Sequence, residues 1–424
     1  MSRQEKLLLF VLACINFTHI IDFMIMMPMG PQLMRFFSLS PQQFSFIVSA
    51  YSLSAGISGF LAAFFVDRFD RKKVIFWAYL GFVLGTIACG LAPTFGWLIV
   101  ARTTAGVFGG VLGAQVLAIV ADVVPYERRG QAMSLIMSAF SVASVVGVPA
   151  GLYLATEISW HAPFLVLGGL GLVVIGLIVR FVPKLDQHLQ RAEVRFNPLE
   201  VVTAVARNPN QLRALWLTTT IMLGHFSIIP MLSPYMVANV GLSENNLYLI
   251  YLTGGLVTIF SAPLVGKLAD QRGKYPVFAI FALLSVLPIY LITTMEPASV
   301  AYIMFVAAIF FIFSNGRMIP TQAMVSSVVE PKHRGGFMSI NSSVQLLAQA
   351  AATYGAGLIV SKTPGGQLIH YSWVGYVAMA VILSSILIGR MVRPIEETRP
   401  ETVEAGEAEP DAAQPVSVAY RPAK

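Results

Sequence analysis

The sequence predicts an all-α membrane protein with twelve transmembrane helices in two pseudo-symmetric six-helix bundles. Of its 424 residues, 56% are hydrophobic and only 12% are charged, and the mean hydropathy is +0.72. A soluble domain of this length does not need so much apolar surface. A bilayer core about 30 Å thick requires about 20 apolar residues per helix. Because lipid offers no partner to backbone polar groups, each spanning segment must be helical.

Twelve apolar stretches have the required length. They cover residues 7–29, 44–66, 73–92, 96–122, 131–155, 161–182, 213–238, 246–268, 275–295, 298–326, 336–361 and 371–392. The first stretch follows Arg3 and Lys6, as the core of a secretory signal does. It is longer than a signal core and has no clear small-residue cleavage site, so we expect a retained helix.

The polar segments divide the chain into four regions. We expect an N-terminal six-helix bundle at 1–182, a cytoplasmic linker at 183–212, a C-terminal six-helix bundle at 213–394 and a disordered cytoplasmic tail at 395–424. The tail is rich in Glu, Pro and Ala and has no periodic apolar face. Within the linker, residues 196–206 are predicted to form a short amphipathic helix on the inner surface.

Basic residues predict the orientation of the helices. With the N-terminus in the cytoplasm, 24 of the 28 Lys and Arg residues lie inside, Arg35 and Lys362 lie outside, and Arg102 and Arg317 lie within the membrane. The positive-inside rule therefore places both termini in the cytoplasm. This asymmetry accounts for the net charge of +7, so we expect membrane lipids as partners and no nucleic acid. We expect a monomer.

The two halves of the sequence repeat each other. His19 precedes Pro28 by nine residues, and His225 precedes Pro234 by nine. The segment 129–134 is echoed at 334–339, and the offsets between such pairs lie between 203 and 206. A duplicated six-helix unit follows, and parallel repeats of this kind place a binding site at their interface near the bilayer midplane.

The loop after the second stretch carries a recognisable pattern, an acid followed by Arg and a basic cluster at residues 67–72. A second copy follows the eighth stretch at residues 266–274. Two copies in equivalent places resemble the signature of the major facilitator superfamily, and the resemblance covers roughly residues 5–395. The first copy has Ala63 and Asp70 where glycines are usual, and the second has Gln271 where Arg is common.

The resemblance implies a cytoplasmic gate at these two loops. Acids near helix ends accept hydrogen bonds from helix N-termini or pair with Arg across the halves, and so hold the inner side shut in an outward-facing state. The alternative is that the basic loops serve only as topology signals. The gate residues that the resemblance implies are Asp67, Arg68, Arg71, Asp270, Arg272 and Lys274.

Two further patterns resemble those of proton-coupled drug and sugar efflux carriers of the arabinose-efflux type. Residues 102–106 in the fourth stretch have the Arg and Gly spacing of that subgroup. The fifth stretch contains Gly147, Pro149 and Gly151, similar to an antiporter signature and expected to kink the helix. The resemblance implies export of a small molecule by proton antiport.

Asp22 is the strongest candidate for a functional residue in the chain, because an ionised group in the first stretch is tolerated mainly when it faces a polar cavity or a partner. At 1.5 Å rise per residue, Asp22 and Arg102 both lie about 10 Å below the outer surface, so contact is expected. Arginine favours the ionised carboxylate and burial favours the protonated one. We expect external protons to neutralise Asp22, with His19 one turn away on the same face as a relay. The alternative is a static ion pair.

Polar residues in the apolar stretches are candidates for the lining of a substrate cavity. One deep acid against two arginines disfavours a cation-selective site, so a neutral, amphipathic or weakly anionic drug, sugar or metabolite is expected. His225 has an alternative role in packing. The candidates are Tyr51, Gln115, His225, Asn315, Arg317, Asn341, Gln345 and Gln349.

Other classes of protein are less well supported. We find no paired carboxylates, nucleophile elbow, phosphate loop or metal-spaced His and Cys cluster, so we expect no enzyme, no metal and no cofactor. Cys14 and Cys89 lie in apolar stretches and are expected in the core. A proton-coupled symporter for uptake of a small metabolite is the main alternative, ahead of a membrane sensor or membrane enzyme.

Overall fold

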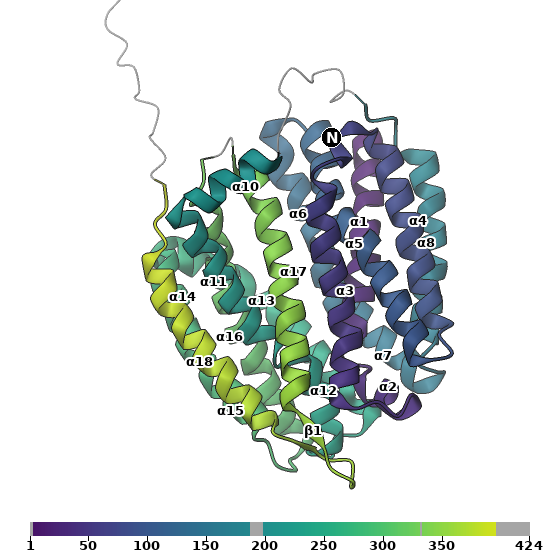
Figure 1. Cartoon of the computed structure of the whole chain (residues 1–424), viewed down its shortest axis with the longest axis vertical. Coiled ribbons are helices and arrows are strands. Elements are labelled where there is room, and N and C mark those ends of the chain that lie inside the picture. Colours follow the sequence, from purple (N-terminus) through teal and green to yellow (C-terminus); the bar gives the residue numbers. More distant parts are fainter. Residues whose placement is uncertain (1–2, 187–197, 331–332, 396–424) are drawn as a thin grey trace, which may run out of the picture.

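The computed structural model of the chain describes residues 3–186, 198–330 and 333–395, and long helices aligned with one axis dominate it (Figure 1). The N-terminus and the short helix α10 (Pro198–Arg207) lie at one end, which we call the N-terminal face. The strands β1 (Ser361–Lys362) and β2 (Leu368–Ile369) pair as an antiparallel hairpin at the other end, the hairpin face. The tail predicted at 395–424 lies outside the described residues from 396 on.

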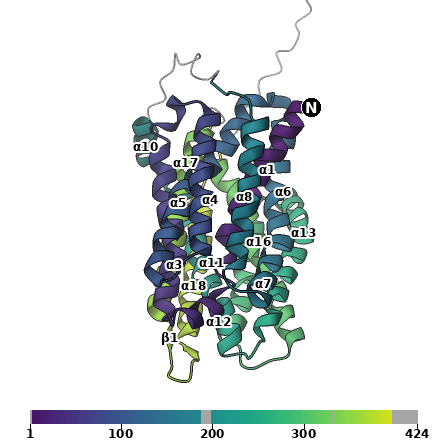
Figure 2. The same ribbon diagram turned by 90° about the vertical axis from the view of Figure 1, so that its right-hand side faces the viewer.

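The first half contains six membrane-length helical segments with short helices between them. These elements are α1 (Arg3–Ile25), α2 (Gly30–Phe36), α3 (Pro41–Ala62), η1 (Val66–Arg68), α4 (Arg71–Gly90), α5 (Phe95–Val123), α6 (Tyr126–Val142), η2 (Ala143–Gly147), α7 (Val148–Glu157) and α8 (Ala162–Phe181). The fifth segment is α6, η2 and α7 joined end to end. Figure 2, a view turned by 90°, shows two of these helices, α4 and α8, packed side by side.

The second half repeats this arrangement after α10. Its elements are α11 (Pro209–Phe226), α12 (Ile229–Ala238), η3 (Glu244–Asn246), α13 (Leu247–Arg272), α14 (Lys274–Leu284), α15 (Val286–Thr293), α16 (Val300–Ser326), α17 (Arg334–Ile359) and α18 (Tyr371–Met391). The amphipathic helix predicted at 196–206 corresponds to α10, and residues 187–197 of the predicted linker lie outside the described residues.

Eleven helical segments of the described chain are long and apolar enough to cross a membrane, one fewer than the twelve predicted. The stretch predicted at 336–361 does form a helix, α17, of 26 residues. Its polar side chains, among them Asn341, Gln345 and Gln349, keep it below the hydropathy of the other spans. α17 packs along α3 of the first half and α11 of its own half, so its polar groups face other helices.

Proline explains several breaks inside the predicted stretches. Pro288 has no N–H to offer the carbonyl four residues earlier, and the ninth segment divides at Ser285 into α14 and α15. In the fifth segment Pro149 follows a π-helical turn in which the Val148 N–H bonds the Ala143 carbonyl. π-bulges of this kind are frequent at functional sites.

The two halves make closer contact at the hairpin face than at the N-terminal face. Gly30 at the start of α2 lies against Pro234 of α12, where an added Cβ would come within 2.7 Å of the proline ring. Arg35 forms a bidentate ion pair with Glu244 of the second half. These hydrogen bonds to Glu244 raise the pKa of Arg35 above its usual value. At the N-terminal face a pocket separates α3 and α5 from α10 and α17.

Candidate functional site

The first half buries an ion pair between α1 and α5. Asp22 is 0% exposed and Arg102 is 1% exposed. The Arg102 Nη1 atom lies 2.8 Å from Asp22 Oδ2 and donates a second bond of 3.2 Å to the Asp22 carbonyl oxygen. The expected contact between these side chains is therefore present. α1 and α5 place them at one depth because they cross the bundle in opposite directions.

Two further side chains complete this cluster. Thr86 on α4 donates its hydroxyl to Asp22 Oδ1 at 2.9 Å. The guanidinium of Arg102 lies 4.5 Å from the centre of the Tyr51 ring on α3, a cation–π geometry. We call Asp22, Thr86, Arg102 and Tyr51 the ion-pair cluster. Sequence reasoning missed Thr86, although its depth, four residues before the end of α4, could have indicated it.

The ion-pair cluster gives each oxygen of the Asp22 carboxylate one hydrogen-bond donor, Thr86 at Oδ1 and Arg102 at Oδ2. The Arg102 Nε and the Tyr51 hydroxyl are buried without a hydrogen-bond partner. The cluster thus combines a buried acid and a buried cation with two polar atoms that have no partner.

His19 lies beside the ion-pair cluster, one turn before Asp22 on α1. Its ring centre is 5.6 Å from that of Phe82 and 6.3 Å from that of Tyr51. The backbone of Gly109 on α5 also lies against this ring, since a Cβ there would come within 3.1 Å of His19 Nε2. The part of His19 in proton relay stays a prediction.

A cavity of about 240 Å³ lies between the two halves, and we call it the central cavity. α1, α6 and η2 supply one wall, and α11, α13 and α16 supply the other. Its lining is rich in aromatic and sulfur-containing side chains with a few hydroxyl, imidazole and amide groups: Phe23, Met24, Met27, Phe140, Ser141, Ser144, His225, Phe226, Ile229, Tyr251, Gly254, Gly255, Thr258, Ile259, Phe311, Asn315 and Met318.

Phe23 connects the central cavity to the ion-pair cluster. It follows Asp22 in the chain and lines the cavity, and its ring centre is 5.6 Å from that of Tyr51. The charged pair thus lies one layer of side chains behind the cavity wall. A displacement of Arg102 would shift Tyr51 and Phe23, and so change the shape of the central cavity, because packed interiors transmit displacements.

Two of the predicted lining residues border the central cavity. The His225 ring stacks on Phe310 at 6.0 Å between ring centres, with 7° between their planes. The Asn315 amide donates to the Thr258 hydroxyl at 2.9 Å and to the Phe311 carbonyl at 2.9 Å. His225 therefore packs against Phe310 and also borders the cavity.

The remaining lining candidates lie outside the lining of this cavity. Tyr51 belongs to the ion-pair cluster, and Gln115 lines a second pocket at the N-terminal face. Arg317 is 0% exposed and donates to the Ser285 hydroxyl at 2.9 Å, while Asn315 and Met318 of the same helix face the cavity. Successive residues of a helix project about 100° apart, and an apolar helix does not reveal from its sequence which face is inward.

Residues on α17 also lie away from the central cavity. Asn341 accepts a hydrogen bond of 2.7 Å from the Thr218 hydroxyl of α11, within the second half. Gln349 is buried and Gln345 is half-buried. These amides lie where α17 packs against its neighbours, so they do not line this cavity.

The predicted kink in the fifth segment lies directly against α1. A Cβ on Gly147 would come within 2.4 Å of the Ile21 side chain, and one on Gly151 within 2.6 Å of the Ile25 side chain. Pro149 lies between them at the start of α7. Glycine at both positions lets the segment approach the residues that flank Asp22.

The predicted cytoplasmic gate has a different arrangement. Arg71 pairs with Asp122 of α5, in the same half, and Asp70 accepts hydrogen bonds from the Lys72 and Leu185 N–H groups. Asp70 thus takes the helix-capping role that was expected of Asp67, whose side chain lies outside the described part of the structure. The remaining members are exposed: Arg68, Asp270, Arg272 and Lys274.

The cysteines and possible metal ligands add nothing to the site. Cys14 and Cys89 are free thiols, partly and fully buried. Within residues 3–186, 198–330 and 333–395, no group of three or more His, Cys, Asp or Glu side chains is placed to hold a metal ion.

Two bundles around a central cavity define the class of protein, and comparison with known families agrees. The family described as Major Facilitator Superfamily matches residues 12–227 and again residues 214–423. The chain belongs to the major facilitator superfamily, and it is a membrane transporter of small molecules rather than an enzyme. The two matched ranges overlap at residues 214–227.

Individual relatives share modest identity with the chain. It is 25% identical to the "Uncharacterized MFS-type transporter YceJ" of Bacillus subtilis (strain 168), over 86% of this chain and 91% of that protein. It is 26% identical to "Multidrug resistance protein 3" of the same organism, over 34% of this chain and 28% of that protein. The crystal structure of a D-xylose-proton symporter has the same fold, with a TM-score of 0.74, 15% identity and coverage of 90% of this chain and 96% of that one.

Proposed function

We propose that this transporter exports a small uncharged or amphipathic organic molecule in exchange for protons. The observation that carries the proposal is the buried pair of Asp22 and Arg102, one layer behind the wall of the central cavity. Intramembrane ionisable residues are usually functional. A pair whose charge changes with one proton supplies the coupling element that antiport requires.

The distribution of basic residues supports a cytoplasmic location for the N-terminal face and for both termini. In that orientation, the closer contacts at the hairpin face make the described arrangement closed to the outside. The bundles at 1–182 and 213–394 then rock about the central cavity, which is the usual motion of such repeats. We expect a single chain to carry out this cycle.

The exchange can be written as two half-cycles. Substrate enters the central cavity from the cytoplasm while Asp22 is ionised and holds Arg102. After the halves rock, a proton from outside binds Asp22, weakens its hold on Arg102 and accompanies release of the substrate outside. Return of the protonated carrier delivers that proton to the cytoplasm, so one proton enters for each molecule that leaves.

The lining of the central cavity supports the choice of substrate. Met24, Met27 and Met318 provide adaptable apolar contact, and Ser144 and Asn315 provide polar contact. No Asp, Glu, Lys or Arg is among the residues that line it. Partial similarity to a multidrug resistance protein is in line with an amphipathic cargo.

Purified protein in liposomes tests the proposal with Nile red, an uncharged fluorescent amphiphile. With the N-terminal face outward and the lumen acidic, we expect dye to accumulate inside as the pH gradient falls. Asp22→Asn should abolish the part of accumulation that depends on the gradient. Glu296→Gln, which changes an exposed carboxylate, is the control and should transport normally.

Two outcomes would contradict the proposal. Gradient-driven accumulation that survives in Asp22→Asn would remove the coupling role of this acid. Dye or sugar that moves in the same direction as the proton would indicate symport and import.

A further inference from the structure

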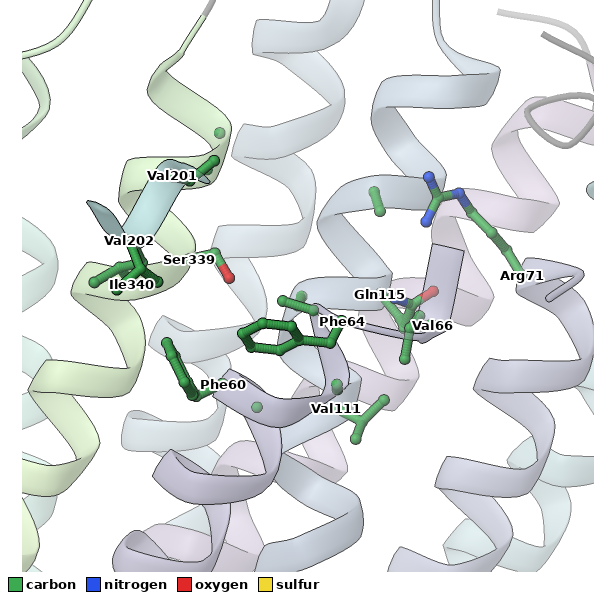
Figure 3. A pocket seen from close by; sticks show the side chains of 17 residues that line it. Phe60, Phe64, Val66, Arg71, Val111, Gln115, Val201, Val202, Ser339 and Ile340 are labelled. Atoms are coloured by element: carbon green, nitrogen blue, oxygen red, sulfur yellow. The ribbon is translucent and has the colours of Figure 1, made fainter. Parts of the chain in front are cut away.

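A second pocket, of about 290 Å³, lies at the N-terminal face where the two halves separate, and we call it the linker pocket (Figure 3). α3 and α5 of the first half supply one wall, with Phe60, Phe64 and Gln115. The other wall consists of Ser339 and Ile340 on α17 and Val201 and Val202 on α10. None of these residues lines the central cavity.

Gln115 is an unsatisfied polar group in the wall of the linker pocket. Its side chain is only 5% exposed, and its Oε1 atom is buried without a hydrogen-bond partner. A buried acceptor without a donor costs about 1–3 kcal/mol. Figure 3 places its amide on one wall and the Ser339 hydroxyl on the other, with the ring of Phe64 between them and Phe60 below Ser339. A ligand that donates a hydrogen bond to Gln115 would remove this cost.

The charges around the linker pocket favour an uncharged ligand. Arg71 is the one charged side chain among the described residues that line it. Arg71 forms an ion pair with Asp122, so its charge is already compensated. The rest of the lining is aliphatic, aromatic or small, which suits a flat ring system.

The far wall of the linker pocket moves with the second half. Val205 of α10 is buried in the hydrophobic core that includes residues of α11 and α17, and α10 contacts both of these helices. Val201 and Val202 are therefore fixed to the second half, while Phe60, Phe64 and Gln115 are fixed to the first. A bound molecule would touch both halves at the face where they are apart.

We propose that the linker pocket is a second binding site, for an uncharged ring-bearing molecule with one hydrogen-bond donor directed at Gln115. Its occupant holds the halves apart at the N-terminal face, because a ligand stabilises the state in which its site exists. Binding there slows turnover without competing for the central cavity.

Binding to the purified full-length protein in lipid nanodiscs tests this site, with empty nanodiscs as the reference for partition into lipid. The probes are 2-naphthol, which has a hydroxyl donor, and 2-methoxynaphthalene, which has the same rings without the donor. We expect the wild-type protein to bind 2-naphthol about 3- to 10-fold more tightly than the ether, the range of a net hydrogen bond. Gln115→Leu should bind both probes equally.

Three variants that fill one cavity or the other show which cavity the probe occupies. Ala114→Phe places a ring in the linker pocket from an exposed position on α5, and it should remove the tighter binding of 2-naphthol relative to the ether. Val202→Trp does the same from α10 and serves if Ala114→Phe does not fold. Ser144→Phe fills the central cavity and should leave this difference between the probes unchanged.

The proposal would be overturned if wild type and Gln115→Leu preferred 2-naphthol over 2-methoxynaphthalene to the same extent. Loss of this preference in Ser144→Phe with retention in both linker-pocket variants would also overturn it. These binding measurements need no proton gradient and no transport. Their outcome therefore does not depend on whether the proposed export mechanism is correct.

Discussion

Each half of the molecule buries one arginine in its fourth helix, but the two arginines have different surroundings. Arg102 in α5 contacts the carboxylate of Asp22, the ring of Tyr51 and the backbone of α1. Arg317 in α16 donates to the neutral hydroxyl of Ser285, and its Nε and Nη2 atoms are buried without partners. The two halves share the same arrangement of helices. Among the described residues, only the arginine of the first half has an acidic partner.

The second half offers Arg317 a weaker form of compensation. Ser285 stands at the break between α14 and α15, and Pro288 removes the N–H that would otherwise serve the Leu284 carbonyl. Carbonyl dipoles at a helix end attract a cation. The two halves therefore bury their arginines against different partners, a carboxylate in the first half and a hydroxyl in the second.

The largest expected effect follows from removal of the Arg102 charge. Arg102→Met leaves Asp22 buried opposite an apolar side chain, and breaking a buried pair in this way costs about 3–5 kcal/mol. Thermal unfolding of the detergent-solubilised protein should show a clearly lower midpoint. Adding Asp22→Asn in the same chain should recover most of the loss. A double variant no more stable than the single one would show that the pair is not coupled.

A smaller loss is expected for the threonine of the ion-pair cluster. Thr86→Val keeps the shape of the side chain and removes the hydrogen bond to Asp22, at a cost of about 1.5–3 kcal/mol for a bond to a charged group. The unfolding midpoint should fall between those of wild type and Arg102→Met. In an Asp22→Asn background the same change should cost less, and an equal cost in both backgrounds would exclude a role for the charge.

The smallest effect is expected for the arginine of the second half. Arg317→Met removes a cation without leaving an acid behind. The free energy of unfolding should therefore stay within about 1 kcal/mol of wild type or rise, as when buried charges are replaced by apolar groups. The unfolding midpoint should change little or increase. A loss as large as that of Arg102→Met would mean that the two halves compensate their arginines alike. That result would break the comparison.

The fold could be predicted from the sequence because lipid allows few solutions. The lengths of the apolar runs and the repeat indicated two six-helix bundles, and the superfamily was identified from loop residues. The contact between Asp22 and Arg102 was predictable because depth in a membrane helix follows from counting residues. A kink near residues 143–147 was expected from Gly147 and Pro149, whereas the break at Ser285 was not, because apolar runs alone do not show which prolines interrupt a helix.

The direction in which a side chain points was harder to predict. Arg317, Asn341 and Gln349 were expected in the cavity, but helices with apolar residues on all sides give no period from which to find the inward face. The ion pair of Arg35 and Glu244 was missed for another reason. Its members lie 209 residues apart in short connections at the hairpin face, and only the packing of α2 against α12 brings them together.

The polarity of α17 has a consequence for biogenesis. A segment that carries Asn341, Gln345 and Gln349 partitions poorly from the translocon into lipid by itself, since insertion becomes less favourable with each polar group near its centre. Its apposition to α3 provides a protein surface in place of lipid. We therefore expect this helix to enter the bilayer late, held at the translocon until earlier segments have assembled to receive it.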